Sequence, residues 1–158
     1  MWKIDKKFLL RVVIIGTIIL IINIFFYQLC IIDGDSMFPT LKNGNIVFIK
    51  KYDLDLKHND IVVIKKDNKT IIKRLVGMPN DKIEINDYLY INGEKNDNLY
   101  IEDRGNISNA IFLKDNEYFV LGDNRQNSID SRFDEIGIIT KDEIIGKIIK
   151  KGDFKCKH

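Results

Sequence analysis

Residues 82–93, Lys-Ile-Glu-Ile-Asn-Asp-Tyr-Leu-Tyr-Ile-Asn-Gly, decide the fold class of this chain. Apolar and polar side chains alternate over 82–85 and again over 88–91, which is the period of a half-buried β-strand. The second run ends in Asn92-Gly93, a dipeptide that favours the tight turn of a β-hairpin. This segment therefore predicts antiparallel β-structure.

Further strand patterns lie on both sides of this segment. Apolar or alternating runs bounded by polar turns predict strands at 45–50, 61–64, 70–76 and 118–121. Thr140 and Glu143 have the spacing of a helical capping box, although Gly146 leaves room for barely one or two turns. Residues 96–116 are polar and rich in asparagine, so we expect an exposed excursion there. The part of the chain after the apolar N-terminus is predicted to be a compact all-β domain.

The composition argues against several function classes. The chain has 158 residues, a net charge of +2 and 30% charged residues. This weak balance does not favour nucleic-acid binding, which needs a concentrated basic patch. The isolated histidines, His58 and His158, and the distant cysteines, Cys30 and Cys156, form no zinc ligand set. We expect no metal, no other cofactor and two unpaired thiols.

The N-terminal segment determines the expected compartment. Residues 8–29 are predominantly apolar and about as long as the ~20 residues that a helix needs to cross a bilayer. Basic residues stand at its N-terminal side: Lys3, Lys6, Lys7 and Arg11. The positive-inside rule then places the N-terminus in the cytoplasm. The predicted organisation is a cytoplasmic N-terminus over 1–7, a transmembrane anchor over 8–29 and an extracytoplasmic all-β domain over 30–158.

A cleavable signal peptide is the competing interpretation of this segment. However, the apolar run is longer than the ~7–15 residues of a signal-peptide core, and no small-X-small cleavage site follows it. Tyr27-Gln28-Leu29 also lacks the small residues that precede a lipid-modified cysteine. We therefore expect an uncleaved anchor.

Ser36 is the first candidate for a catalytic residue. It lies in Asp33-Gly34-Asp35-Ser36-Met37-Phe38-Pro39-Thr40-Leu41, directly after the apolar segment. Gly34 permits another chain to approach closely, and Pro39 turns the backbone away just after the serine. The pattern suits a nucleophile, but a polar loop with an ordinary solvated serine also explains it.

A serine nucleophile needs a group that takes its proton. His58 has no obvious carboxylate partner in the sequence and His158 lies at the C-terminal end, so a Ser-His-Asp triad fits poorly. Lysine performs this role when desolvation keeps its amine neutral. Lys73 follows the apolar pair 71–72 and is the candidate; the alternative is a lysine that extends its amine into solvent at a strand edge.

A polar loop follows the strand predicted at 118–121. It reads Gly122-Asp123-Asn124-Arg125-Gln126-Asn127-Ser128-Ile129-Asp130-Ser131-Arg132 and is dense in hydrogen-bonding groups. Ordinary turn chemistry accounts for Gly-Asp-Asn. A surface pair of Asp130 and Arg132 would contribute only about 0–1 kcal/mol. Taken singly, this loop leaves its role open.

Together, these stretches resemble the bacterial type I signal peptidases, the Ser-Lys serine proteases of family S26. Residues 34–41 resemble the family's serine box, 73–81 its lysine box and 122–132 its third signature. Residues 59–63 and 137–147 are similar to two further family segments. The order of the motifs and the N-terminal anchor also match. Gly34 stands where one branch of the family has a serine, which makes the chain similar to the short Gram-positive form.

The resemblance implies a signal-peptidase or LexA-like β-fold and a membrane-anchored serine endopeptidase of the bacterial cell membrane. It implies that Ser36 attacks the scissile carbonyl, that neutral Lys73 is the general base and that Ser128 hydrogen-bonds the lysine amine. It also implies a charged scaffold around them: Arg74, Asp123, Asp130 and Arg132. The Ser36 N–H is the expected oxyanion donor, and Gly34 leaves the second donor open.

The resemblance also implies how substrate binds. A peptide would add as an extended strand between residues 31–34 and 70–72. Six residues would contact it, the apolar ones in shallow pockets for small side chains: Ile32, Gly34, Met37, Val63, Ile71 and Ile72. Plain core packing is the alternative role for the apolar ones. The implied partners are the lipid bilayer and secretory preproteins whose signal peptides end in a small-X-small sequence such as Ala-X-Ala.

Two other functions stay open at this point. LexA-type self-cleaving proteases also use a Ser-Lys dyad, but they carry a DNA-binding helical domain where this chain has an apolar segment. A non-catalytic, membrane-anchored β-module that binds peptides is the second alternative. The sequence does not indicate an oligomeric state.

Overall fold

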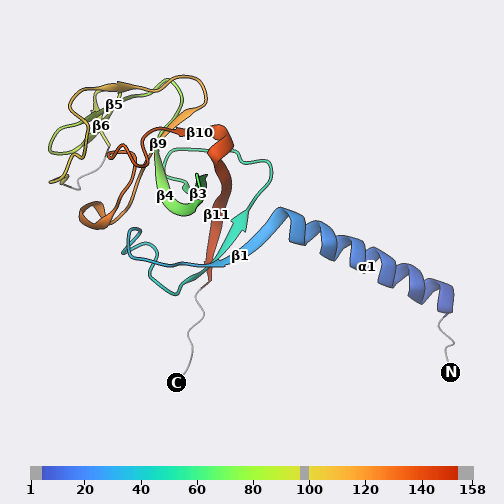
Figure 1. Cartoon of the computed structure of the whole chain (residues 1–158). Helices are drawn as coiled ribbons and strands as arrows, with labels where there is room; N and C mark the ends of the chain where they lie inside the picture. The colour runs from blue at the N-terminus through green and yellow to red at the C-terminus, as the bar shows by residue number, and fades with distance from the viewer. Residues whose placement is uncertain (1–4, 97–99, 153–158) are drawn as a thin grey trace.

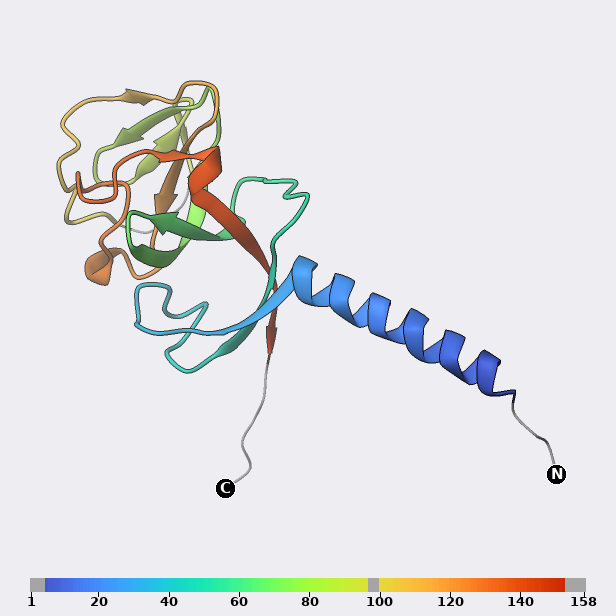
Figure 2. The ribbon, with the colours of Figure 1, turned by 45° about the vertical axis from the view of Figure 1, so that its right-hand side comes forward.

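The computed structural model describes residues 5–96 and 100–152, and it is mostly β-structure with one N-terminal helix (Figure 1). Helix α1 spans Lys6–Phe26. It projects away from the β-domain in both views (Figure 1, Figure 2). Among the described residues, no helix combines the length and the apolar character needed to cross a membrane.

The helical part of the predicted anchor ends at Phe26 rather than at residue 29. Residues 27–29 belong to strand β1, Tyr27–Ile31. This strand pairs antiparallel with β2, Ile46–Lys50, so that Tyr27 lies opposite Lys50. The main-chain groups of 27–31 thus find partners in the sheet instead of in another helical turn.

The larger sheet has seven strands in the order β1-β2-β11-β3-β4-β9-β10, and every neighbouring pair is antiparallel. Its further members are β3 (Ile61–Lys66), β4 (Lys69–Gly77), β9 (Glu117–Leu121), β10 (Ile139–Thr140) and β11 (Ile144–Gly152). The predicted strands at 45–50, 61–64, 70–76 and 118–121 are confirmed, each to within a few residues. Strand β4, which carries Lys73, lies inside the sheet between β3 and β9.

The smaller sheet has four strands in the order β7-β6-β5-β8. They are β5 (Lys82–Ile85), β6 (Leu89–Ile91), β7 (Glu94–Lys95) and β8 (Ile111–Phe112). The predicted Asn-Gly hairpin is confirmed, with φ of 54° at Asn92 and 85° at Gly93. This sheet lies at the end of the domain away from α1 (Figure 2).

Two segments differ from their predictions. The excursion at 96–116 includes β8, and Ile101 and Leu113 within it are buried in the core of the smaller sheet. The capping box of Thr140 and Glu143 is present, but it opens only one 3₁₀ turn, η2, Lys141–Glu143. Strand β11 follows at once. It lies between β2 and β3 and pairs antiparallel with both.

One apolar cluster sets the position of the candidate serine. Ile32, Met37 and Leu41 from the segment around Ser36 are buried against Val47 of β2 and Val63 of β3. Burying a side chain of this size contributes about 1.5–3 kcal/mol, so the cluster holds the loop firmly on the sheet. Cys30 is a free thiol beside this cluster, while Cys156 and His158 lie outside the described residues.

Candidate active site

The serine loop is fixed from two sides. The N–H of Leu41 donates to the carbonyl of Met37 at 2.9 Å, which closes a turn just after Ser36. On the other side, the N–H of Asn124 donates to the Ser36 carbonyl at 3.0 Å, and its side-chain amide donates to the Asp35 carbonyl at 3.2 Å. Ser36 itself is half-buried. Asn124 was not among the predicted site residues, although it lies within the third motif.

Lys73 is buried on strand β4 with a relative exposure of 4%. Its main chain lies opposite Val62 of β3 in the sheet. Its Nζ donates a hydrogen bond to Ser128 Oγ at 3.0 Å. The alternative of a lysine that extends its amine into solvent at a strand edge is therefore wrong.

The environment of Lys73 favours its neutral form. Burial lowers the pKa of Lys73 below the ordinary value of 10.5 because the charged amine is desolvated. The Asp130 carboxylate acts in the opposite direction, and the Arg132 guanidinium lowers the pKa further. The neutral amine, which is the form that accepts a proton, is therefore reached at a lower pH in Lys73 than in an ordinary lysine.

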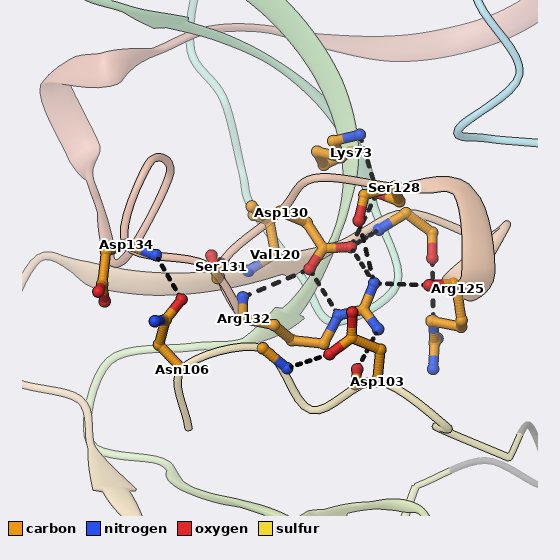
Figure 3. Close-up of polar contacts among 12 residues, drawn as sticks. Lys73, Asp103, Asn106, Val120, Arg125, Ser128, Asp130, Ser131, Arg132 and Asp134 are labelled. Carbon is orange, nitrogen blue, oxygen red and sulfur yellow. Dashed lines mark hydrogen bonds and ion pairs between the residues drawn. The ribbon is translucent and has the colours of Figure 1, made fainter. Parts of the chain in front are cut away.

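Ser128, Asp130 and Arg132 form a continuous network below the lysine (Figure 3). The Ser128 hydroxyl donates to Asp130 Oδ2 at 2.8 Å, which leaves its oxygen free to accept from Lys73. Arg132 Nε donates to Asp130 Oδ1 at 2.8 Å and Nη2 donates to Oδ2 at 3.0 Å. Both charged side chains are almost completely buried, so the pair is not the surface pair considered from the sequence.

Gly122 allows the serine loop and the third motif to pack against each other. A Cβ at this position would lie 2.5 Å from the Ser128 Cβ and 2.6 Å from the Ser36 carbonyl oxygen, closer than real Cβ contacts come. The Gly122 N–H donates to Asp130 Oδ2 at 2.9 Å. Only glycine fits where the serine loop and the third motif touch. From the sequence, Gly122 was interpreted only as part of an ordinary turn.

Arg74 and Asp123 join the lysine strand to the same loop. Arg74 Nε and Nη2 donate to the two oxygens of Asp123 at 2.7 and 2.6 Å. Arg74 Nη1 also donates to the Asn59 carbonyl at 2.6 Å. This bidentate pair ties β4 to the loop after β9 and to the turn before β3.

A pocket of about 250 Å³ lies beside Ser36 and Lys73, and both residues line it. The six residues predicted to contact substrate line the same pocket: Ile32, Gly34, Met37, Val63, Ile71 and Ile72. Ile32, Met37 and Val63 are also part of the apolar core. They therefore pack in the core and shape the pocket at the same time.

His58 does have a carboxylate partner, which the sequence did not reveal. Its Nε2 lies 2.7 Å from Asp81 Oδ2, and 23 residues separate the two in the chain. Neither residue lines the pocket beside Ser36. Over residues 5–96 and 100–152, the structure shows no cluster of three His, Cys, Asp or Glu side chains that would hold a metal.

Comparison with known proteins identifies the family. Residues 6–150 match the family model described as signal peptidase, peptidase S26. Signal peptidase I S of Bacillus subtilis is 39% identical over 155 residues, covering 85% of this chain and 82% of the relative. A signal peptidase I of Bacillus amyloliquefaciens is 35% identical over 152 residues, covering 86% and 82%. A crystal structure of a signal peptidase I from Enterococcus faecalis matches with a TM-score of 0.49 and 25% identity, covering 61% of this chain and 98% of that one.

The chain belongs to the signal peptidase family, peptidase S26. It is a signal-peptide-cleaving serine peptidase, which confirms the function predicted from the ordered motifs.

Proposed function

We propose that this chain cleaves secretory preproteins after a small-X-small sequence by a Ser36–Lys73 dyad. The observation that carries the proposal is the buried Lys73, held by Ser128 beside the pocket that Ser36 also lines. A buried lysine amine is costly to keep charged, and it is suited to take the proton of a nearby hydroxyl. The family membership favours this function over LexA-type self-cleavage and over a non-catalytic peptide-binding module.

The first half of the reaction forms an acyl-enzyme. Ser36 Oγ attacks the scissile carbonyl carbon while its proton passes to Lys73 Nζ. The tetrahedral intermediate collapses as the carbon–nitrogen bond breaks, and Lys73 gives the proton to the departing amine of the mature protein. The signal peptide stays on Ser36 as an ester.

In the second half, Lys73 takes a proton from a water molecule as that water attacks the ester carbonyl carbon. The bond between this carbon and Ser36 Oγ then breaks, Lys73 returns the proton to Ser36 Oγ, and the signal peptide leaves as a carboxylic acid. The Ser36 N–H is the proposed oxyanion donor in both halves, and loss of such a donor costs about 2.7–4 kcal/mol of transition-state stabilisation. Ser128 and Asp130 hold the lysine amine in place, and Arg132 neutralises Asp130. Arg74 and Asp123 keep the lysine strand in register with the loop.

The pocket supports the proposed substrate class. A peptide strand between 31–34 and 70–72 would direct alternate side chains into it, as β-augmentation requires. The walls at Ile32, Met37 and Val63 are buried and close-packed, so they favour small side chains at the first and third positions before the cut.

The test is cleavage of a preprotein with an Ala-X-Ala site by the full chain in detergent. Ser36→Ala and Lys73→Ala are compared with wild type and with Lys69→Ala, an exposed lysine on the same strand. We expect cleavage after the last alanine by wild type and the Lys69 variant, and none by folded Ser36 or Lys73 variants. Cleavage by the Lys73 variant at the wild-type rate would contradict the dyad.

We also propose that the helical part of residues 8–29, which ends at Phe26, anchors the peptidase in the bacterial cell membrane, with residues 1–7 in the cytoplasm and the catalytic domain outside. The apolar composition of this segment and the basic residues at its start support the proposal. The test is alkaline extraction of membranes together with protease treatment of intact protoplasts. Release of the chain by alkali, or protection of the catalytic domain from external protease, would contradict it.

A further inference from the structure

A loop that leads out of the smaller sheet contacts Arg132 directly (Figure 3). The Asp103 carbonyl accepts a hydrogen bond from Arg132 Nη1 at 2.7 Å. The Asn106 N–H donates to the Arg132 carbonyl at 2.7 Å. The loop thus holds both the guanidinium and the main chain of Arg132. It is anchored by Ile101, which is 1% exposed in the core of the smaller sheet.

The shape of this loop depends on two exposed residues. The Asp103 carboxylate accepts a hydrogen bond from the Gly105 N–H at 2.8 Å, which closes a tight turn. Gly105 has φ of +61°, a left-handed conformation. A Cβ at Gly105 would lie 2.7 Å from the carbonyl carbon of Arg132 and 3.0 Å from its Cβ. The approach of this loop to Arg132 therefore requires glycine at this position.

Arg132 connects this loop to the proposed general base. Its guanidinium makes the bidentate contact with Asp130 described above, and Asp130 accepts from Ser128, which accepts from Lys73. Every link is a hydrogen bond between 2.7 and 3.0 Å. Arg132 is 1% exposed and close-packed, so a shift of its main chain is passed on to the groups that it binds.

We propose that Asp103 and Gly105 are positioning residues of the peptidase, which fix Arg132 and, through Asp130 and Ser128, the amine of Lys73. This inference rests on the proposed function of the Ser36–Lys73 dyad. It gives the smaller sheet a part in catalysis although neither residue lines the pocket beside Ser36. A loop that only stabilised the fold would affect unfolding but not the chemical step.

The main test compares Gly105→Ala with Gly93→Ala. Gly93 also has positive φ, +85°, but a Cβ there would meet nothing within 4 Å, so it is a control for backbone strain alone. We expect Gly105→Ala to lower kcat at least about tenfold with KM little changed, since a misplacement of 1 Å can cost about 10²-fold. Gly93→Ala should keep the wild-type kcat.

The acid limb of the pH–kcat profile gives a readout that a structural role would not move. Displacing Arg132 from Asp130 removes a positive charge near Lys73 and leaves Asp130 less neutralised, and both changes raise the pKa of Lys73. The limb of Gly105→Ala should therefore move to higher pH than that of wild type. An unshifted limb and a kcat equal to that of Gly93→Ala would overturn the inference.

A second pair of variants covers the case in which Gly105→Ala does not fold. Asp103 is exposed, so Asp103→Ala should fold, yet it loses the acceptor for the Gly105 N–H. Asp103→Asn keeps that acceptor. We expect a lower kcat for Asp103→Ala and rescue by Asp103→Asn; wild-type kcat in Asp103→Ala would overturn the inference. Lys73→Ala is measured beside them: if it remains active, the dyad itself has failed, whereas an inactive Lys73→Ala with an unaffected Asp103→Ala rejects only the positioning role.

Discussion

Lys73 Nζ donates a hydrogen bond to Ser128 Oγ at 3.0 Å, across 55 residues of sequence. Ser128 is able to accept because its own proton is donated to Asp130 at 2.8 Å. The lysine amine is therefore held from one side by an oriented oxygen. When Lys73 is neutral, the single lone pair of its nitrogen is available for a proton from Ser36. The hydrogen bond thus gives the proposed base a direction as well as a position.

Replacement of Lys73 by Met separates activity from stability. We expect Lys73→Met to be inactive because it has no amine, yet to unfold with a free energy equal to that of wild type or about 0.5–2 kcal/mol higher. The physical reason is that methionine fills the same space without the cost of burying an amine. Urea unfolding at neutral pH measures this change. A loss of stability greater than about 1 kcal/mol, an effect typical of structural residues, would show that Lys73 is retained for the fold.

Ser128→Ala and Ser131→Ala should have opposite consequences. Ser128→Ala removes the acceptor that holds the lysine amine, and we expect kcat to fall about 10²-fold or more, since a positioned general base contributes about 10²–10⁴-fold. Ser131 Oγ instead accepts a hydrogen bond from the Val120 N–H at 3.0 Å within the buried part of the loop. Ser131→Ala should cost about 1–3 kcal/mol of stability and leave kcat of the folded enzyme intact. Equal kcat values for the two variants would argue against a specific role for Ser128.

Ile72→Ala tests whether the pocket selects small side chains. Ile72 lines the pocket and is only half-buried, so truncation should widen the pocket without unfolding the domain. We expect the ratio of kcat/KM for a valine site to that for an alanine site to rise about tenfold, the lower end of the effect of a methylene in an apolar pocket. Ile149→Ala, an exposed position on β11, is the control. An unchanged ratio would place Ile72 outside the contact with substrate.

The parts of the fold that were predicted correctly are those that have a local sequence pattern. The hairpin at Asn92-Gly93 follows from backbone preference, and β3 and β4 follow from their apolar runs. Strand β11 was missed because the capping box of Thr140 and Glu143 forms as predicted but does not continue into a helix. Pairing with β2 and β3, which lie far away in the sequence, outweighs that local signal.

The residues of the site also fall into two groups: those that a sequence motif indicates and those that only the three-dimensional structure shows. Ser36, Lys73 and Ser128 were found because they belong to ordered motifs, and the structure brings the three into one region. The contact of Asp103 with Arg132 carries no sequence signal, because it joins an irregular, exposed loop to a buried side chain 29 residues away. The same holds for the requirement for glycine at 105, which depends on where the Arg132 carbonyl lies. Such contacts follow only from the packing of the two sheets.

The pH dependence of the acylation rate tests whether Lys73 acts as a neutral base. Burial lowers the pKa of Lys73 below its ordinary 10.5. The neutral fraction grows as the pH rises through this lowered pKa, so the single-turnover rate constant should climb with pH, with a midpoint below the ordinary lysine value. The Lys69→Ala control should give the same curve. A rate constant that is flat from mildly acidic to alkaline pH, or a midpoint at or above the ordinary lysine pKa, would contradict the account.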